Sequence, residues 1–258
     1  MSLLYVTSFS EDLYNASGKR LINSFIEHKI EAPLLVCYEN FVFPQPKPQQ
    51  SQILTYALHE SKYLQKWLSD NRDIIPDYLG GLATKQNHPE IFDVLMKRKA
   101  SRFFRKVAAL EYAVAKYGDQ YDYIIWLDCD GYYIKNMPNQ VIYDLFQQNA
   151  VIYHLGKWRT NKKAGIESGW IGFSKRHGGY GILKKIFDFY SSGQFRTLPK
   201  WDDGYVMRYF IANQPPNQIK CCDLTPKCTT SHPIKDDSPI RTYFYHEKGR
   251  HFKMKVSL

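Results

Sequence analysis

The stretch YIIWLDCDG at residues 123–131 joins a run of apolar residues to two carboxylates. Such a run is typical of a strand buried on both faces of a sheet. In extended backbone the side chains of Asp128 and Asp130 would point to one face, where their charges repel unless a divalent cation lies between them. Carboxylate oxygens suit Mg²⁺ or Mn²⁺, and Gly131 allows a sharp turn or a close ligand. The alternative is a solvated turn after a strand.

Apolar segments alternate with helical ones along the rest of the chain. Strands are predicted at residues 3–9, 33–41, 150–155 and 169–175, and helices at 12–28, 53–68, 91–117, 180–190 and 203–212. The segment 91–117 could be one long helix or two. Residues 44–50 carry three prolines and are predicted to form a loop. Residues 213–239 are predicted to be irregular. The alternation predicts an α/β fold with a mostly parallel sheet covered on both faces, in which ligands bind at the carboxyl ends of strands.

The composition limits the class of protein. The 258 residues are 44% hydrophobic and carry a net charge of +10, which excludes a mainly disordered chain. No apolar run reaches the roughly 18 to 20 residues of a membrane span, so we expect a cytoplasmic protein that could still contact a membrane peripherally. The cysteines are odd in number and lack a CxxC pair, which predicts reduced thiols. A zinc site is the minor alternative for Cys221, Cys222 and Cys228.

Basic residues cluster in two segments, at residues 96–106 and 248–255. In the first, Arg102 and Lys106 are four residues apart and share a helix face. That face is either solvated or directed at a bound phosphate. No zinc finger and no RNA-binding aromatic motif occurs in the sequence, so nucleic acid is not an expected partner.

Four segments together resemble one enzyme family. IIWLDCDGYYIKNMP at residues 124–138 resembles the Asp-x-Asp region of GT-A glycosyltransferases, where the motif ends a strand and holds Mn²⁺ or Mg²⁺ on the diphosphate of a nucleotide-sugar. VTSFS at 6–10 resembles the first strand and loop around the nucleotide, and ESGWIGFSK at 167–175 resembles the strand that lines the sugar site. HEKGR at 246–250 is similar to the C-terminal His-x-x-Gly element of glycogenin-like enzymes.

The resemblance implies a single GT-A domain, a Rossmann-like α/β fold whose mostly parallel central sheet is flanked by helices. Residues 1–130 would form the nucleotide-binding half. Residues 131–258 would bind sugar and acceptor and would carry a C-terminal metal and phosphate element. The sequence departs from the glycogenin-like pattern at Glu167, where Asn is usual, and around Asp202, where Asp-Gln-Asp is usual. The usual C-terminal Lys-Pro-Trp is absent.

The resemblance also implies roles for individual residues. The metal ligands would be Asp128, Asp130 and His246, with contact to ribose or metal-bound water as the alternative for Asp128. The donor nucleotide would contact Thr7, Ser8, Phe9, Arg102, Lys106, Asp128, Lys248, Gly249 and Arg250. The sugar and acceptor would contact Glu167, Ser168, Gly169, Trp170 and Trp201. For Trp170 and for Trp158, core packing is the simpler alternative.

Asp202 and Asp203 form a second acidic pair and are the candidate catalytic residues. One carboxylate could accept a proton from the acceptor hydroxyl, as in an inverting enzyme. In a retaining enzyme it would only bind sugar hydroxyls. Aspartate is also favoured as a helix N-cap, so one of the two could cap a helix while the other acts on substrate.

These features together predict a metal-dependent glycosyltransferase that moves a sugar from a nucleotide-sugar, with UDP favoured, to a glycan, a lipid-linked glycan or a protein hydroxyl. The His-x-x-Gly ending favours retention of configuration. One alternative is a sugar nucleotidyltransferase, but VTSFSEDLYN at residues 6–15 lacks the glycine-rich basic loop of such enzymes. The other is a module that binds a nucleotide-sugar or a polynucleotide without turnover.

Overall fold

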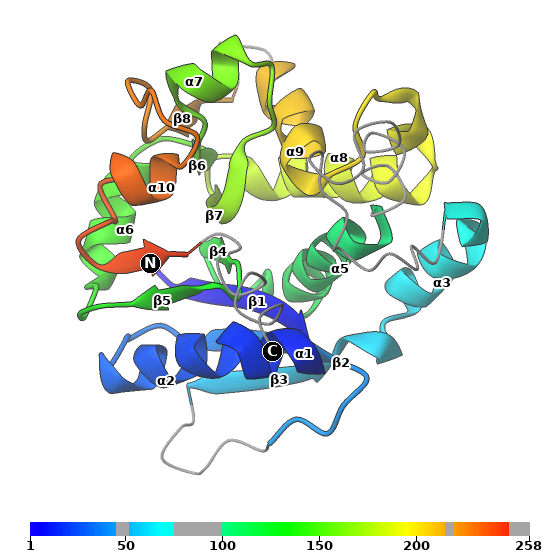
Figure 1. The fold of residues 1–258 in the computed structure, drawn as a ribbon, viewed down its shortest axis with the longest axis horizontal. Helices are drawn as coiled ribbons and strands as arrows, with labels where there is room; N and C mark the ends of the chain where they lie inside the picture. The colour runs from blue at the N-terminus through cyan, green and yellow to red at the C-terminus, as the bar shows by residue number, and fades with distance from the viewer. Residues whose placement is uncertain (45–51, 75–99, 215–218, 248–258) are drawn as a thin grey trace, which may run out of the picture.

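The computed structural model describes residues 1–44, 52–74, 100–214 and 219–247, and within them a seven-stranded sheet has the order β3-β2-β1-β4-β7-β6-β8 (Figure 1). The strands are β1 Leu3–Ser10, β2 Leu34–Glu39, β3 Ile53–Ala57, β4 Tyr123–Leu127, β6 Val151–His154, β7 Glu167–Ser174 and β8 Cys221–Asp223. Only β7 runs antiparallel to its neighbours β4 and β6. The predicted α/β fold with a mostly parallel sheet is therefore confirmed.

Successive side chains of β4 enter two separate cores. Ile124 and Trp126 belong to one, and Ile125 and Leu127 to the other. Helices that contribute to the first core are α3 Lys62–Asp70, α5 Ala100–Tyr117, α8 Gly179–Ser191 and α9 Asp203–Ala212. Helices that contribute to the second are α2 Lys19–Glu27, α6 Asn139–Phe146 and α10 Pro233–Asp236. Burial on both faces explains why this strand is apolar throughout.

A second, small sheet brings the C-terminal part of the chain to the end of β4. Strand β5 (Gly131–Tyr133) pairs antiparallel with β9 (Phe244–His246), and Gly131 lies opposite His246. Figure 1 shows β9 in red beside β5 in green. Gly131 has no positive φ, but a Cβ there would collide with the Phe244 ring. This glycine is therefore needed for close packing rather than for an unusual turn.

The N-terminal helical segment is close to the predicted one but is not uniform. It consists of α1 (Glu11–Leu13), a π-helical turn η1 (Tyr14–Gly18) and α2. Such π turns often occur at functional sites. Here the turn places Ser17 Oγ 3.8 Å from the Sγ atom of Cys129, the residue between the two aspartates in the sequence.

The helix predicted over residues 53–68 is wrong in its first half. Ile53–Ala57 forms β3, paired with β2, and a short 3₁₀ turn η3 (Leu58–Glu60) follows. Helix α3 begins only after Ser61, whose hydroxyl accepts a hydrogen bond from Leu64 N and so caps it. The β-branched and aromatic residues of β3 favour a strand once a partner strand is available.

Several other segments differ from the predictions. Residues 213–239 contain β8 and α10, although they were predicted to be irregular. Helix α7 (Gly156–Asn161) and the 3₁₀ turns η4 (Arg72–Ile74) and η5 (Gln194–Thr197) were not predicted. Of the helix predicted at 91–117, α5 is the described part, and most of the loop predicted at 44–50 lies outside the described residues.

The cysteines are free thiols, as predicted. Within the described residues, Cys221, Cys222 and Cys228 do not gather into a metal-ligand group. No helix in the described ranges combines the length and apolar character needed to cross a bilayer.

Candidate active site

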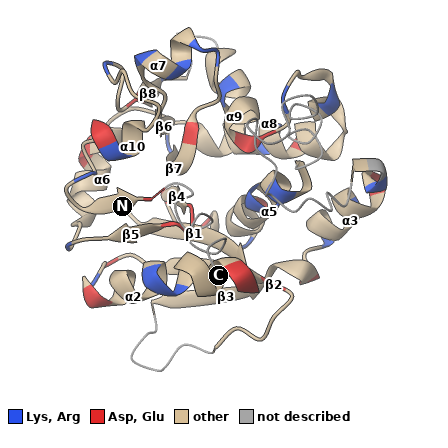
Figure 2. Ribbon diagram, in the orientation of Figure 1, with Lys and Arg blue, Asp and Glu red and all other residues tan. Residues whose placement is uncertain are grey.

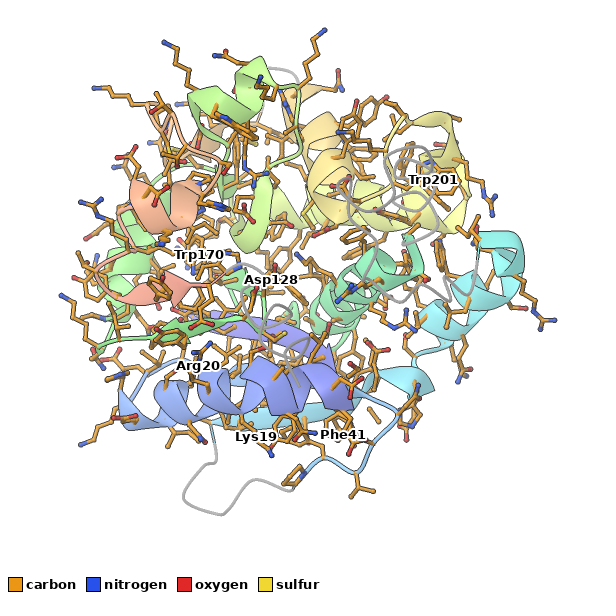
Figure 3. All side chains as sticks on the ribbon, in the orientation of Figure 1. Lys19, Arg20, Phe41, Asp128, Trp170 and Trp201 are labelled. Atoms are coloured by element: carbon orange, nitrogen blue, oxygen red, sulfur yellow. The ribbon has the colours of Figure 1, made fainter. Side chains whose placement is uncertain are left out.

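The two aspartates at the end of β4 are brought together by a tight turn. Gly131 N donates a hydrogen bond to Asp128 O (3.1 Å), so the backbone at the aspartates turns instead of continuing as an extended strand. One carboxylate oxygen of Asp128 is fixed by Trp126 Nε1, which donates to Oδ1 at 2.6 Å. Trp126 was predicted only as a buried apolar residue, although its indole N–H is the kind of group that needs a partner when buried. Figure 3 shows Asp128 near the middle of the molecule.

His246 completes a group of three candidate ligands. Its Nε2 lies 3.0 Å from Asp130 Oδ1 and 4.0 Å from Asp128 Oδ2, and its side chain is buried. One ligand atom from each of the three residues lies within 4.8 Å of the other two. Two carboxylates and an imidazole at this spacing are a suitable donor set for a divalent cation. The residues present therefore fit the metal that the sequence predicted.

Burial and the neighbouring charges shift the pKa of both His246 and Asp128. Burial disfavours the imidazolium, but the hydrogen bond and charge of Asp130 outweigh it and raise the pKa of His246. For Asp128, burial raises the pKa of the carboxyl, Lys106 opposes this, and the charge of Asp130 adds to it. Carboxylates that repel each other in a confined space are stabilised by a cation between them.

Lys106 joins this group to a second acidic residue. Its ammonium lies 2.9 Å from Asp128 Oδ1 and 2.6 Å from Asp203 Oδ2, and it donates to the hydroxyl and carbonyl of Ser168, both at 3.0 Å. Burial alone would lower the pKa of Lys106, but the charges of Asp128 and Asp203 raise it. The sequence left the face of Arg102 and Lys106 either solvated or directed at a bound phosphate. In the structure Lys106 is buried and bridges two carboxylates. Arg102, one turn earlier on α5, is exposed.

The second acidic pair divides into two different environments. Asp202 is the N-cap of α9 and accepts a hydrogen bond from Tyr205 N at 2.9 Å, so the capping alternative is confirmed for it. Burial and the charge of Asp203 raise the pKa of Asp202. Asp203 is buried and faces Lys106. Sequence alone could not find this ion pair, because α5 and α9 meet only through the tertiary fold.

Trp201 precedes this pair but packs elsewhere. Its ring meets Phe195 edge-on at 5.3 Å, and its Nε1 donates to Leu198 O. Figure 3 shows it well away from Asp128, on the side of α8. Its predicted role as an apolar wall for a sugar has no support in this arrangement.

The predicted sugar-site residues of β7 have different surroundings. Trp170 is fully buried in the second core, as its core-packing alternative predicted. Glu167 is buried and forms an ion pair with Arg159 of α7. Ser168 contacts Lys106, and Gly169 O accepts a hydrogen bond from Asp128 N at 2.8 Å. Ser168 and Gly169 therefore lie in the candidate site.

The end of β1 lies beside the acidic turn. Val6 is opposite Trp126 in the sheet register, so the predicted donor residues Thr7, Ser8 and Phe9 follow at the level of Asp128. Thr7 is buried, and its hydroxyl has no hydrogen-bond partner among the described residues. The Phe9 ring is buried and stacks on Tyr14. The remaining predicted donor residues, Lys248, Gly249 and Arg250, lie outside the described residues.

An open groove of about 540 Å³ lies between α2 and β5. Its lining includes Arg20, Asn23, His28 and Tyr132, and the three candidate metal ligands are not among its lining residues. Arg20 lies over the Tyr132 ring, 4.2 Å from its centroid, and forms an ion pair with Glu247 at 2.6 Å. The groove is thus separate from the ligand cluster.

No protein-family model and no curated protein sequence matches the chain. Among solved structures, it is similar to a glycosyltransferase involved in the glycosylation of the major capsid of PBCV-1, with 12% identity, 98% of each chain covered and a TM-score of 0.49. It is also similar to mouse xyloside xylosyltransferase 1, with 11% identity, 86% of each chain covered and a TM-score of 0.46. For the glycosyltransferase GlyE of Streptococcus pneumoniae TIGR4 the identity is 13%, the coverage 86% of this chain and 45% of that one, and the TM-score 0.44.

Proposed function

We propose that the protein is a metal-dependent glycosyltransferase that moves a sugar from a nucleoside diphosphate to an acceptor hydroxyl. The observation that carries this proposal is the convergence of Asp128, Asp130 and His246 at the carboxyl end of a central strand. Ligands of open α/β sheets bind at that end. The Asp-x-Asp motif and the His-x-x-Gly element, which resemble those of GT-A enzymes, supply two parts of this one cluster.

Asp128, Asp130 and His246 would hold Mn²⁺ or Mg²⁺. When bound, such a cation neutralises the negative charge that develops on a leaving diphosphate. Trp126 and Lys106 occupy one carboxylate oxygen of Asp128, and the other oxygen faces His246. The side chains around the cluster thus orient its ligands before any substrate arrives, as outer partners do in metal sites.

We propose that Asp203 binds the transferred sugar and that Asp202 has a structural role as the N-cap of α9. Asp203 shares Lys106 with Asp128, so a carboxylate that binds sugar hydroxyls would be held at a fixed place beside the diphosphate site. Lys106 would add a hydrogen-bond donor there. A carboxylate that positions the sugar, rather than one that activates the acceptor, favours retention of configuration.

The donor would lie along the end of β1, with the base near Ser8, between the buried Thr7 and Phe9, and the diphosphate at the ligand cluster. UDP is our preferred nucleotide, on the resemblance to glycogenin-like enzymes. The acceptor would be a hydroxyl of a glycan, a lipid-linked glycan or a protein.

Thermal unfolding with Mn²⁺ and a panel of nucleoside diphosphates tests the site. Ligands that bind only the folded state raise the midpoint, so we expect a rise that requires Mn²⁺ and UDP together. Asp130→Asn and His246→Gln should abolish it. Asp119→Asn and His232→Gln, which change exposed residues of the same types, should retain it.

Release of UDP from a panel of UDP-sugars then tests turnover. Release that depends on Mn²⁺ and is lost in Asp203→Asn supports the transferase. Nucleotide binding without release or transfer would favour a binding module. A midpoint that no nucleotide changes, with or without metal, would rule out the diphosphate site.

A further inference from the structure

We propose that one end of the molecule, formed by α7 and the neighbouring turn 225–228, binds the surface of an anionic lipid bilayer. This surface, called the α7 tip below, consists of Lys157, Trp158, Lys162, Lys163 and Lys227. Trp158 N donates a hydrogen bond to Cys228 O at 3.2 Å, which joins the helix to the turn. Figure 1 shows α7 at the edge of the molecule, far from α2 and β3.

The lysines of the α7 tip are not paired with acidic side chains; Asp223, the acid beside the start of α7, is bound to backbone N–H groups instead. Its four lysines are exposed, and none forms an ion pair within the described part of the chain. Residues 155–166 and 224–232 contain no Asp or Glu. Figure 2 shows α7 carrying blue segments and no red.

The other basic surface on this half of the molecule is different. On and beside α8, Lys184 pairs with Asp188, and Lys175 pairs with Asp119. Arg176 likewise pairs with Asp122. Paired charges of this kind attract an anionic surface less than isolated ones do, so α8 provides a natural comparison for α7.

Trp158 adds an aromatic ring to the unpaired lysines. Trp158 is 36% exposed, so insertion of the ring into a bilayer would remove apolar surface from water. Tryptophan is enriched at the membrane–water interface because its ring is apolar and its N–H is polar. Exposed Trp with Lys on one short surface is the composition that interfacial segments share.

The α7 tip is held rigidly by hydrogen bonds to the body of the protein. Asp223 accepts hydrogen bonds from the backbone N–H groups of Leu155 and Gly156, at 3.0 and 2.9 Å. At the other end, Arg208 donates to Ala164 O, and Arg159 donates to Gly165 O and pairs with Glu167. Because the backbone that carries Trp158 is already ordered, this surface loses less conformational entropy when it binds a membrane.

The shape of the surface favours a bilayer over a polynucleotide. Single-stranded nucleic acid is bound in basic grooves along which several aromatic rings stack on successive bases. The α7 tip has one exposed ring on a short helix at the edge of the fold, which suits contact with a flat surface. This inference does not depend on the glycosyltransferase proposal.

Sedimentation with vesicles tests the proposal on the full chain. We expect binding to vesicles of phosphatidylcholine with about 30% phosphatidylglycerol, no binding to phosphatidylcholine alone, and loss of binding at high salt. Each lysine near an anionic surface contributes about a factor of five, so Lys157→Gln with Lys162→Gln should lower the partition coefficient about 30-fold. Trp158→Ala should lower it about 10-fold.

A matched control is Lys175→Gln with Lys184→Gln, two acid-paired lysines beside and on α8. It removes the same charge and should leave the partition coefficient unchanged. Unchanged thermal midpoints exclude misfolding as the cause in each variant. If the α8 variant weakens binding as much as the α7 variant, net charge alone is responsible and the proposal is wrong. Binding to a polynucleotide but not to anionic vesicles, with the same dependence on the α7 lysines, would also overturn it.

Discussion

Gly169 lies so close to His246 that a Cβ atom at its position would be 2.5 Å from His246 Nε2. The carbonyl of the same glycine accepts a hydrogen bond from Asp128 N. One residue of β7 therefore sets the position of the acidic turn and leaves room for the imidazole. The glycine of the Ser-Gly pair in β7 is therefore required by the close packing of His246, one of the candidate metal ligands.

Gly169→Ala should displace His246 and weaken Mn²⁺ binding at least 10-fold, because the imidazole cannot keep its place beside a methyl group at that distance. Loss of one ligand or its orientation typically costs this much affinity. Calorimetry of Mn²⁺ binding measures the change. The control is Gly181→Ala in α8, where a Cβ meets no atom within 4 Å. That variant should bind Mn²⁺ normally and be slightly more stable. Equal Mn²⁺ affinity in both variants would contradict this account of Gly169.

Lys106→Met should destabilise the protein by about 3–5 kcal/mol, because it leaves the carboxylates of Asp128 and Asp203 without their shared cation. Urea unfolding measures the loss. Adding Asp203→Asn removes one of the stranded charges and should recover part of the stability. The double variant is informative because residues in one ion-pair network are not additive. Strictly additive losses would mean that Lys106 and Asp203 do not interact.

Asp202→Ala should cost about 1 kcal/mol of stability by removing the N-cap of α9. Asp202→Asn should restore most of it, since Asn caps helices nearly as well as Asp. If Asp202 serves only as a cap, the Asn variant should also keep its UDP-sugar turnover, measured as release of UDP. Loss of turnover in a stable Asn variant would assign Asp202 a part in catalysis.

His154 should make stability depend on pH in the mildly acidic range. Its ring is fully buried beside Ser238 and the carbonyl of Trp170, and burial lowers its pKa to about 4. Below pH 6.5 the unfolded chain takes up a proton that the folded chain does not. The contribution of the neutral, buried His154 to the free energy of unfolding is therefore fully present above about pH 6.5 and is lost as the pH falls toward 4.

Comparison with His154→Gln isolates this effect from other titrating groups. The stability difference between wild type and variant should shrink by about 2 kcal/mol between pH 7.5 and pH 5. Urea unfolding at the two pH values provides the measurement. A difference that stays constant would mean that His154 binds its proton equally well in the folded and unfolded chain.

The main features of the fold follow from local patterns in the sequence. The continuous apolar run ending at Leu127 identifies a central strand, because only a strand buried on both faces needs apolar residues at every position. Helix α9 was predicted with its observed bounds, since Asp202 supplies a cap where the apolar periodicity begins. Strand β3 was missed because the apolar residues Ile53, Leu54, Ala57 and Leu58 have the spacing of a helix face.

Residues of the candidate site could be predicted only where they belong to a recognisable sequence motif. Asp128, Asp130 and His246 are brought together, as the motifs predict, although the turn between the aspartates was not foreseen. The role of Lys106 could not be predicted, because its partners are set by how α5 and α9 pack on the sheet. Core packing of Trp170 was one of two interpretations of the sequence, since an aromatic ring in a strand faces a core or a ligand according to what covers that face.

The pairing of β5 with β9 has a consequence for the order of folding. Gly131 and His246 are far apart in the sequence, and closing a loop of that length costs about 4 kcal/mol of chain entropy before the contact forms. Strands β1, β2 and β4 can assemble without it, so we expect the small sheet to form late. Because His246 reaches the acidic turn only through this pairing, the ability to bind a divalent cation should appear in the last kinetic phase of refolding.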